Sequence, residues 1–285
     1  MKIGINMLLW TGHVGEELVP VLQALKATGF DGVEVPMFDA EVPGHYRWLG
    51  GVLDDLGLER TASVVIPDGA HNPASPDAAH RQGAVDHLSR AIDCCHALGA
   101  QAMVGPYFQP LGEFTGDRPQ PEELERCAEV HRIVAPLARA AGVTCALENL
   151  NRFEAYLLNT SEQTVAHCRN VDAPGFGILY DTFHAHIEEK DPLAALRQVH
   201  AAGYLAHVHI SENDRGTPGS GHAKIREAIA VLRELQYDGW LTIEAFGRGV
   251  PALAAATKVW RDFFASPEEV YTQGYRYIRE CWDNS

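Results

Sequence analysis

The chain lacks an apolar run long enough for a transmembrane helix, which requires about 20 consecutive apolar residues. Its first ten residues, MKIGINMLLW, contain a single lysine and a short apolar run, and no small-residue cleavage site follows them before His13. We therefore interpret this segment as a first β-strand rather than as a signal peptide. No membrane partner is expected.

Positive charge is scarce. The chain has 23 lysines and arginines against 38 aspartates and glutamates, which gives a formal net charge of −15. Nucleic acids and anionic membranes are bound through basic surfaces. The sequence therefore argues against a nucleic-acid partner, whereas a small neutral substrate is compatible with this charge.

Cysteine pairs of the Cys-x-x-Cys type are absent. The six cysteines fall within expected helices and strands, at Cys94, Cys95, Cys127, Cys145, Cys168 and Cys281. Thiols in such places pack as small apolar side chains. We expect no disulfide framework, which fits a cytoplasmic protein.

A Gly-x-Gly-x-x-Gly motif after the first strand is also missing, which counts against a doubly wound dinucleotide-binding sheet. What the chain does contain is a recurring unit: an amphipathic helix, a glycine or short turn, and an apolar β run. Five clear copies span residues 22–36, 94–106, 137–149, 199–211 and 232–245. Glycine just past each helix is expected to cap it in the left-handed conformation.

Eight β runs are expected, near residues 2–7, 32–36, 60–66, 101–106, 144–149, 176–181, 205–210 and 240–245. Eight units in 285 residues give about 36 residues each, in line with a βα repeat. Apolar strands alternating with helices predict a parallel sheet covered by helices. The sequence therefore predicts one α/β domain over residues 1–285, a (β/α)₈ TIM barrel with an extra C-terminal helix near 266–282, and an open doubly wound sheet is the alternative.

Potential metal ligands lie where these strands end, which is where barrels of this type carry their chemistry. Glu148, Asp181 and Glu244 end the fifth, sixth and eighth β runs. The seventh run carries His207 and His209, which share one face because they are two residues apart. Three carboxylates on one rim repel one another unless a cation lies between them. We therefore predict a divalent metal site.

Simpler interpretations apply to other polar residues. A single acid near a strand end is more often a cap than a ligand, and Glu34 is expected to face the rim without an assigned role. His207 is expected to be a packed or hydrogen-bonded histidine. The remaining histidines show no ligand geometry in the sequence and are expected on the surface or in helices: His13, His45, His71, His80, His87, His96, His131, His167, His200 and His222.

Several longer motifs point to one family. The segments ENLNRFEAYLLNT, LYDTFHAHIEE, HVHISENDR and YDGWLTIEAF resemble motifs of the D-tagatose 3-epimerase/D-psicose 3-epimerase family, the ketose 3-epimerases among the xylose-isomerase-like barrels. The likeness is densest over residues 140–265 and extends through most of the chain.

This resemblance implies a divalent metal, usually Mn²⁺, with Co²⁺ or Mg²⁺ as alternatives. Its ligands would be Glu148, Asp181, His209 and Glu244. It also implies that three residues contact the sugar around its first two oxygens: Glu154, His184 and Arg215. Family members are commonly dimers or tetramers, so we expect a homodimer or a homotetramer.

Epimerisation at C3 of a free ketose removes a proton from one face and returns one to the other, through a metal-bound cis-enediolate. It needs two acid/base groups on opposite sides, and Glu148 and Glu244 are the candidates. Alternatives on the same barrel are an aldose–ketose isomerase, a hydroxypyruvate or keto-inositol isomerase, or a 3-keto-glycoside epimerase. A metal-dependent hydrolase such as a DNA-repair endonuclease would require more histidines at the rim and a basic surface, and the sequence has neither. A non-catalytic sugar-binding or scaffold protein is disfavoured, because three carboxylates at the rim are costly to keep without a metal.

The expected pocket walls depart from the family pattern. Asn6 and Met7 stand where the family tends to carry an aromatic residue, and Ser211 stands where it has glycine. The segment after the fourth strand has Pro106 and Leu111 and contains no tryptophan to cap the sugar. Three aromatics are candidate wall residues: Trp10, Phe108 and Phe246. The sequence therefore leaves the identity of the sugar open.

Overall fold

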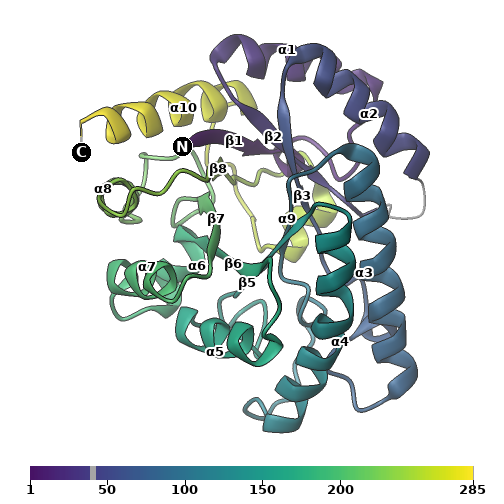
Figure 1. The fold of residues 1–285 in the computed structure, drawn as a ribbon. Coiled ribbons are helices and arrows are strands. Elements are labelled where there is room, and N and C mark those ends of the chain that lie inside the picture. Colours follow the sequence, from purple (N-terminus) through teal and green to yellow (C-terminus); the bar gives the residue numbers. More distant parts are fainter. Residues whose placement is uncertain (39–42, 285) are drawn as a thin grey trace.

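Eight parallel strands close into a barrel surrounded by helices (Figure 1). The computed structural model describes residues 1–38 and 43–284. In chain order and in space, the strands are β1 (Lys2–Asn6), β2 (Gly32–Pro36), β3 (Glu59–Ser63), β4 (Ala102–Gly105), β5 (Thr144–Glu148), β6 (Phe176–Asp181), β7 (Leu205–Ile210) and β8 (Trp240–Ile243). Pairing of Ile3 on β1 with Leu241 on β8 closes the ring. The predicted (β/α)₈ barrel is confirmed, and each expected β run corresponds to a strand.

The helices that cover the barrel are α1 (Val19–Thr28), α2 (Pro43–Leu56), α3 (Ala78–Leu98), α4 (Pro121–Ala140), α5 (Ser161–Val171), α6 (Thr182–Glu188), α7 (Pro192–Ala201), α8 (Ile225–Glu234), α9 (Pro251–Ala256) and α10 (Pro267–Asp283). Short 3₁₀ turns span Met7–Leu9, Glu16–Leu18 and Gly69–His71. The extra C-terminal helix is confirmed as α10, whose buried Val270 and Ile278 face the barrel core. Within the described residues, no helix combines the length and apolar character that a bilayer crossing demands.

Two of the predicted glycine caps decide where helices end. Gly29 and Gly99 follow α1 and α3 in the left-handed region, at φ 116° and 73°, which glycine adopts without a Cβ clash. The same prediction is wrong after α8. That helix ends earlier, so Gln236 takes the left-handed conformation at φ 56°, and Gly239 instead makes room for the Tyr237 hydroxyl.

The interior is apolar, as a parallel sheet covered on both faces requires. All six cysteines are buried in it, and none of them forms a disulfide. Burial raises the pKa of the Cys95 and Cys127 thiols, which keeps them protonated. Several of the buried polar side chains gather at the carboxyl ends of the strands, among them Glu148, Asp181, His209 and Glu244.

Candidate functional site

Four ligand-type side chains meet at the carboxyl end of the barrel. Glu148 and Asp181 are the last residues of β5 and β6, His209 lies one residue before the end of β7, and Glu244 directly follows β8. All four are buried, and one ligand atom from each lies within 4.8 Å of the others. The structure therefore brings together the four residues that the sequence predicted as metal ligands.

His209 Nδ1 faces the three carboxylates of this cluster. It lies 3.4 Å from Glu244 Oε1 and 3.9 Å from both Glu148 Oε1 and Asp181 Oδ2. Glu148 Oε1 and His209 Nδ1 are buried and have no hydrogen-bond partner. Buried polar atoms are normally satisfied, so this arrangement of oxygen and nitrogen donors around one point fits a divalent cation.

Burial and neighbouring charges shift the pKa values of the three carboxyl groups in the cluster. Burial and the neighbouring Glu244 raise the pKa of Glu148 well above its ordinary value. Burial also raises the pKa of Asp181, although Arg215 opposes it. Burial acts the same way on Glu244, but His209 and Arg215 outweigh it and lower the pKa of that carboxyl. Burial therefore disfavours the charged form of Glu148 and Asp181, and a bound cation would favour it.

Arg215 supplies positive charge beside the cluster. Its Nη1 lies 2.8 Å from Asp181 Oδ2 and 2.6 Å from Glu244 Oε2, and its guanidinium lies over the Phe183 ring at 3.9 Å. The residue adopts φ 65° in the loop after β7, an uncommon conformation for a residue with a Cβ. The loop is therefore shaped to aim this side chain inward.

Ser211 anchors that arginine. Its Oγ accepts a hydrogen bond from Arg215 Nη1 at 2.9 Å and donates one to the Glu244 carbonyl at 2.7 Å. The serine that replaces the family's expected glycine thus joins the β7 end to β8. It holds two of the predicted site residues in register.

His184 and Glu154 line the same cavity. His184 Nδ1 accepts from the Asn151 backbone N–H at 3.0 Å, and its Nε2 lies 3.6 Å from Glu148 Oε1. Asn151 also donates through Nδ2 to Glu154 Oε1 at 2.8 Å. Burial raises the pKa of Glu154 and lowers the pKa of His184 well below its usual value. The three predicted sugar contacts therefore surround one end of the cavity.

Glu34 has a structural role that the sequence did not assign. It is fully buried, and its Oε1 accepts from Asn6 Nδ2 and from His209 Nε2, both at 2.9 Å. Its Oε2 accepts from Thr61 Oγ1 at 2.9 Å and lies 3.1 Å from His207 Nε2. These partners come from β1, β3 and β7, so the carboxylate sits inside the barrel below the rim.

The expectation that Glu34 faces the rim was therefore wrong. A carboxylate in the middle of the apolar strand GVEVP is costly to bury without several hydrogen-bond partners. This position in the strand could have indicated that Glu34 has partners inside the barrel. His207 is buried, as predicted for a packed histidine, and its Nε2 lies 3.1 Å from Glu34 Oε2 rather than in the four-residue rim cluster.

Two of the histidines expected on the surface or in helices do lie in helices, but they are buried and form a contact that the sequence did not indicate. His131 on α4 and His167 on α5 are buried, with His131 Nδ1 2.8 Å from His167 Nε2. They group with Cys127 as a set of ligand-type atoms. The sequence could not reveal this, because the contact depends on how α4 and α5 pack outside the barrel.

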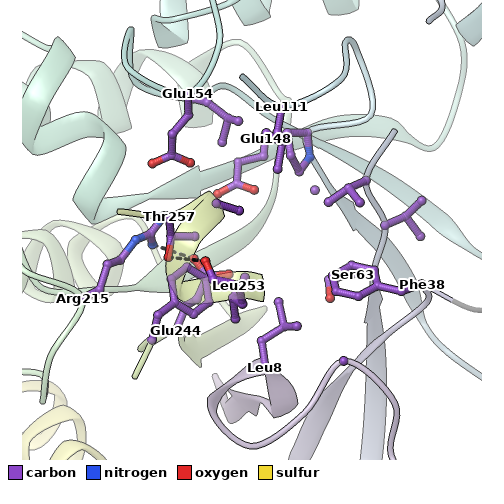
Figure 2. Close-up of a pocket in the computed structure, with 18 of the residues that line it drawn as sticks. Leu8, Phe38, Ser63, Leu111, Glu148, Glu154, Arg215, Glu244, Leu253 and Thr257 are labelled. Atoms are coloured by element: carbon purple, nitrogen blue, oxygen red, sulfur yellow. Dashed lines mark hydrogen bonds and ion pairs between the residues drawn. The ribbon is translucent and has the colours of Figure 1, made fainter. Parts of the chain in front are cut away.

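The site opens into a cavity of about 370 Å³ (Figure 2). Pro106, Leu111 and Phe246 line it. Two other candidate wall residues do not belong to this lining: Phe108 is buried in the core, and Trp10 packs beside Tyr271, with ring centroids 6.3 Å apart. Phe108 follows β4 and is completely buried among core residues, so it does not reach the open cavity.

Fold and site together define a barrel enzyme with a cluster of ligand-type side chains at its rim. A sequence model described as xylose isomerase-like TIM barrel matches residues 22–281. A probable ketose 3-epimerase of Synechocystis sp. is 31% identical over 287 residues, covering 100% of this chain and 98% of that protein. The ketose 3-epimerase of Arthrobacter globiformis is 31% identical over 98% of this chain and 96% of its own.

Solved structures agree. An L-ribulose 3-epimerase superposes with a TM-score of 0.90 at 28% identity, over 99% of this chain and 95% of that one. The D-psicose 3-epimerase from Clostridium cellulolyticum H10, solved with D-tagatose, gives 0.89 at 27% identity over 99% of both chains. The chain belongs to the ketose 3-epimerase family of xylose isomerase-like TIM barrels.

Proposed function

We propose that this protein is a divalent-metal-dependent ketose 3-epimerase, an isomerase that interconverts C3 epimers of a free ketose, and that residues 1–285 act as one such domain. The observation that carries the proposal is the pair Glu148 and Glu244. In Figure 2 the first reaches the cavity from above and the second from below, on two sides of one small space. The names of the relatives support the same activity.

The residues fit a metal ion. Glu148, Asp181, His209 and Glu244 offer oxygen and imidazole donors, and two of the donor atoms are buried without a partner. When bound, a divalent cation supplies a Lewis acid that polarises the ketose carbonyl. We propose Mn²⁺, with Co²⁺ and Mg²⁺ as alternatives, to be distinguished by activity of the metal-stripped protein reloaded with each.

The two glutamates move the proton. One carboxylate removes the C3 proton from one face of the substrate, and the other acid returns a proton to the opposite face, which inverts the configuration. The roles exchange in the reverse reaction. Glu154, His184 and Arg215, at the same end of the cavity, hold the first two oxygens of the ketose and keep C3 between the carboxylates.

The test is proton exchange followed by NMR. The manganese-loaded protein is incubated in D₂O with fructose, psicose, tagatose, sorbose, ribulose and xylulose. The expected result is deuterium at C3 together with the C3 epimer. Deuterium at C1 with an aldose product would instead make the protein an aldose–ketose isomerase. No exchange with any free ketose would refute the proposal.

Two further properties remain proposals. We propose a homodimer or homotetramer, because the motifs resemble those of a family whose members form both, and light scattering at several protein concentrations tests it. We propose a cytoplasmic location, which six buried cysteines outside any disulfide support. Fractionation of the source cells against a periplasmic or secreted marker tests the second.

A further inference from the structure

The loop between β7 and α8 carries Arg215. It spans residues 211–224 and contains no helix or strand. In Figure 2 the Arg215 side chain extends toward Glu244 at the edge of the cavity. A side chain on a loop keeps a fixed position only if the loop backbone is itself held. The contacts that hold this loop therefore bear on the site.

Glu212 makes several of these contacts. It does not line the cavity, and it is only 1% exposed. Its Oε1 accepts a hydrogen bond from the Gly219 N–H at 3.0 Å. Its Oε2 accepts from the N–H groups of Asn213 and Ala223, both at 3.1 Å. The buried carboxylate thus joins the beginning, the middle and the end of the loop through charge-assisted hydrogen bonds, which offset the cost of its burial.

The backbone of Glu212 also begins the turn that presents Arg215. The Glu212 carbonyl accepts from the Arg215 N–H at 3.0 Å, and the Arg215 carbonyl accepts from the Phe246 N–H at 2.9 Å. Arg215 holds the left-handed conformation, at φ 65°, which persists in a residue with a Cβ only where the surrounding structure fixes it. The conformation of Arg215 therefore depends on the turn that Glu212 begins.

Helix α10 supports the same loop from the other side. The Gly219 backbone is left-handed, at φ 89°, and a Cβ there would lie 2.7 Å from the Tyr277 ring. Thr217 Oγ1 donates to Glu269 Oε1 at 3.4 Å. The middle of the loop is therefore enclosed between the Glu212 carboxylate and α10.

The position of Arg215 is narrowly defined at the end of its side chain. Its Nη1 lies within hydrogen-bond distance of both Asp181 Oδ2 and Glu244 Oε2. Such bonds weaken steeply as their geometry departs from the optimum. A shift of the loop backbone therefore withdraws the guanidinium from both carboxylates at once.

We propose that Glu212 is a positioning residue, whose carboxylate holds the β7–α8 loop in the conformation that brings Arg215 to the site. This inference rests on the proposed ketose 3-epimerase activity, in which Arg215 holds oxygens of the substrate. The alternative is that Glu212 stabilises the fold without influence on Arg215. The two differ in whether the effect of changing Glu212 persists when Arg215 is absent.

Two variants disturb the hydrogen bonds of Glu212 in different ways. Glu212→Gln keeps the size of the side chain but leaves one acceptor oxygen, so at least one of the three backbone N–H groups loses its partner. Gly221→Ala keeps Glu212 and adds a Cβ 2.5 Å from Glu212 Oε2, which displaces the carboxylate. Gly221 is exposed, so this variant provides the test where a buried amide prevents folding.

Matched controls make the same changes elsewhere. Asp31→Asn alters a carboxylate that accepts from the Ile3 N–H at 2.7 Å, at the amino end of the barrel. Gly51→Ala adds a Cβ on α2 that points into open space. Both controls are expected to keep the wild-type kcat/KM, whatever their thermal stability.

The first measurement is hydrogen exchange by mass spectrometry, on peptides that cover residues 213–223 of the manganese-loaded, full-length protein. We expect about tenfold faster exchange in both loop variants and no change in the two controls. This measurement does not depend on turnover. Wild-type protection in both loop variants would overturn the inference, because the carboxylate would then not hold the loop.

The second measurement is a double-mutant cycle with Arg215→Ala. Alone, Glu212→Gln and Gly221→Ala are each expected to lower kcat/KM for C3 epimerisation about 10- to 100-fold, as misplacement of a substrate-holding group by about 1 Å does. With Arg215→Ala present, each is expected to change kcat/KM less than about twofold, because the residue through which Glu212 acts is absent.

Two kinetic outcomes would overturn the inference. One is a wild-type kcat/KM in the loop variants, and the other is an equal loss with and without Arg215, since Glu212 would then act on another part of the protein. In both cases wild-type epimerisation remains and the proposed function stands. Absence of C3 exchange with every ketose in the wild-type protein instead removes the proposed function, and the positioning role with it, so the two failures are distinguishable.

Discussion

Glu34 Oε1 lies 2.9 Å from His209 Nε2, across the interior of the barrel. The carboxylate accepts the Nε2 proton, so the other ring nitrogen, Nδ1, faces Glu148, Asp181 and Glu244. A carboxylate behind a ligating histidine fixes the tautomer and the orientation of the ring. Glu34 therefore positions the histidine in the rim cluster.

Glu34→Gln is expected to weaken Mn²⁺ binding about 10- to 100-fold, because the amide cannot accept from Asn6 and His209 through a charged oxygen. Isothermal titration calorimetry measures the change directly, independently of turnover. Thr61→Val is the control: it removes one partner of Oε2 and leaves the His209 contact in place. Unchanged metal affinity in Glu34→Gln would mean that Glu34 does not position His209 for the metal.

The two-glutamate mechanism makes a prediction beyond loss of activity. Glu148→Gln and Glu244→Gln are each expected to reduce epimerisation about 10²- to 10⁴-fold at metal concentrations that saturate the variant. Each should still exchange the C3 proton of one epimer with D₂O, and the two variants should exchange opposite epimers. NMR of both epimers with both variants provides the measurement.

The control for this pair is Glu234→Gln, an exposed carboxylate on α8 that pairs with Arg197, which should behave as wild type. Exchange of the same epimer by both glutamine variants would contradict a proton transfer from two faces.

Much of the barrel was predictable because its signal is local and repeated. Each strand is an apolar run after a helix, and its last residues fall on the rim wherever the strand lies in the ring. Glu148 and Asp181 could therefore be placed from sequence alone. Glu34 could not, because its partner His209 is 175 residues away, and only closure of the barrel brings the two together.

The same limit applies to Ser211 and to the His131–His167 pair. The sequence showed that Ser211 replaces a glycine, but not that its hydroxyl would reach Arg215, since that contact depends on the left-handed turn of the loop. Side-chain networks of this kind depend on tertiary geometry and produce no periodic pattern in the sequence.

Ser211→Ala is expected to raise KM about three- to tenfold, or about 0.7–1.4 kcal/mol. This is less than the roughly 1.5–3 kcal/mol of a hydrogen bond to a charged group, because Arg215 keeps its two carboxylate partners. Steady-state kinetics with the best ketose gives KM and kcat, and calorimetry gives the metal affinity, which should stay within about twofold. Ser220→Ala, whose hydroxyl donates to a backbone carbonyl in the same loop, is the control. A larger loss of metal affinity than of substrate affinity would place Ser211 with the metal ligands rather than with Arg215.

The buried histidine pair predicts how stability depends on pH. Burial lowers the pKa of His131 to about 4 and of His167 to about 2, against about 6.5 in the unfolded chain. His131 Nε2 faces the Tyr107 carbonyl at 3.1 Å and Nδ1 faces His167, so both rings are neutral when folded. Their contribution to stability is complete above pH 6.5 and is lost as the pH falls toward the folded pKa values, because the unfolded chain then binds more protons.

At pH 5 each histidine is expected to remove on the order of 2 kcal/mol from the free energy of unfolding. Urea unfolding between pH 7.5 and 5, with EDTA present so that metal binding does not contribute, measures the loss. His131→Gln and His167→Gln should each remove about half of the pH-dependent loss of unfolding free energy that the two histidines cause together. This holds whatever the stability of each variant at pH 7.5. His96→Gln, an exposed position on α3, should keep the wild-type slope. A wild-type slope in both glutamine variants of the pair would mean that other groups cause the acid sensitivity.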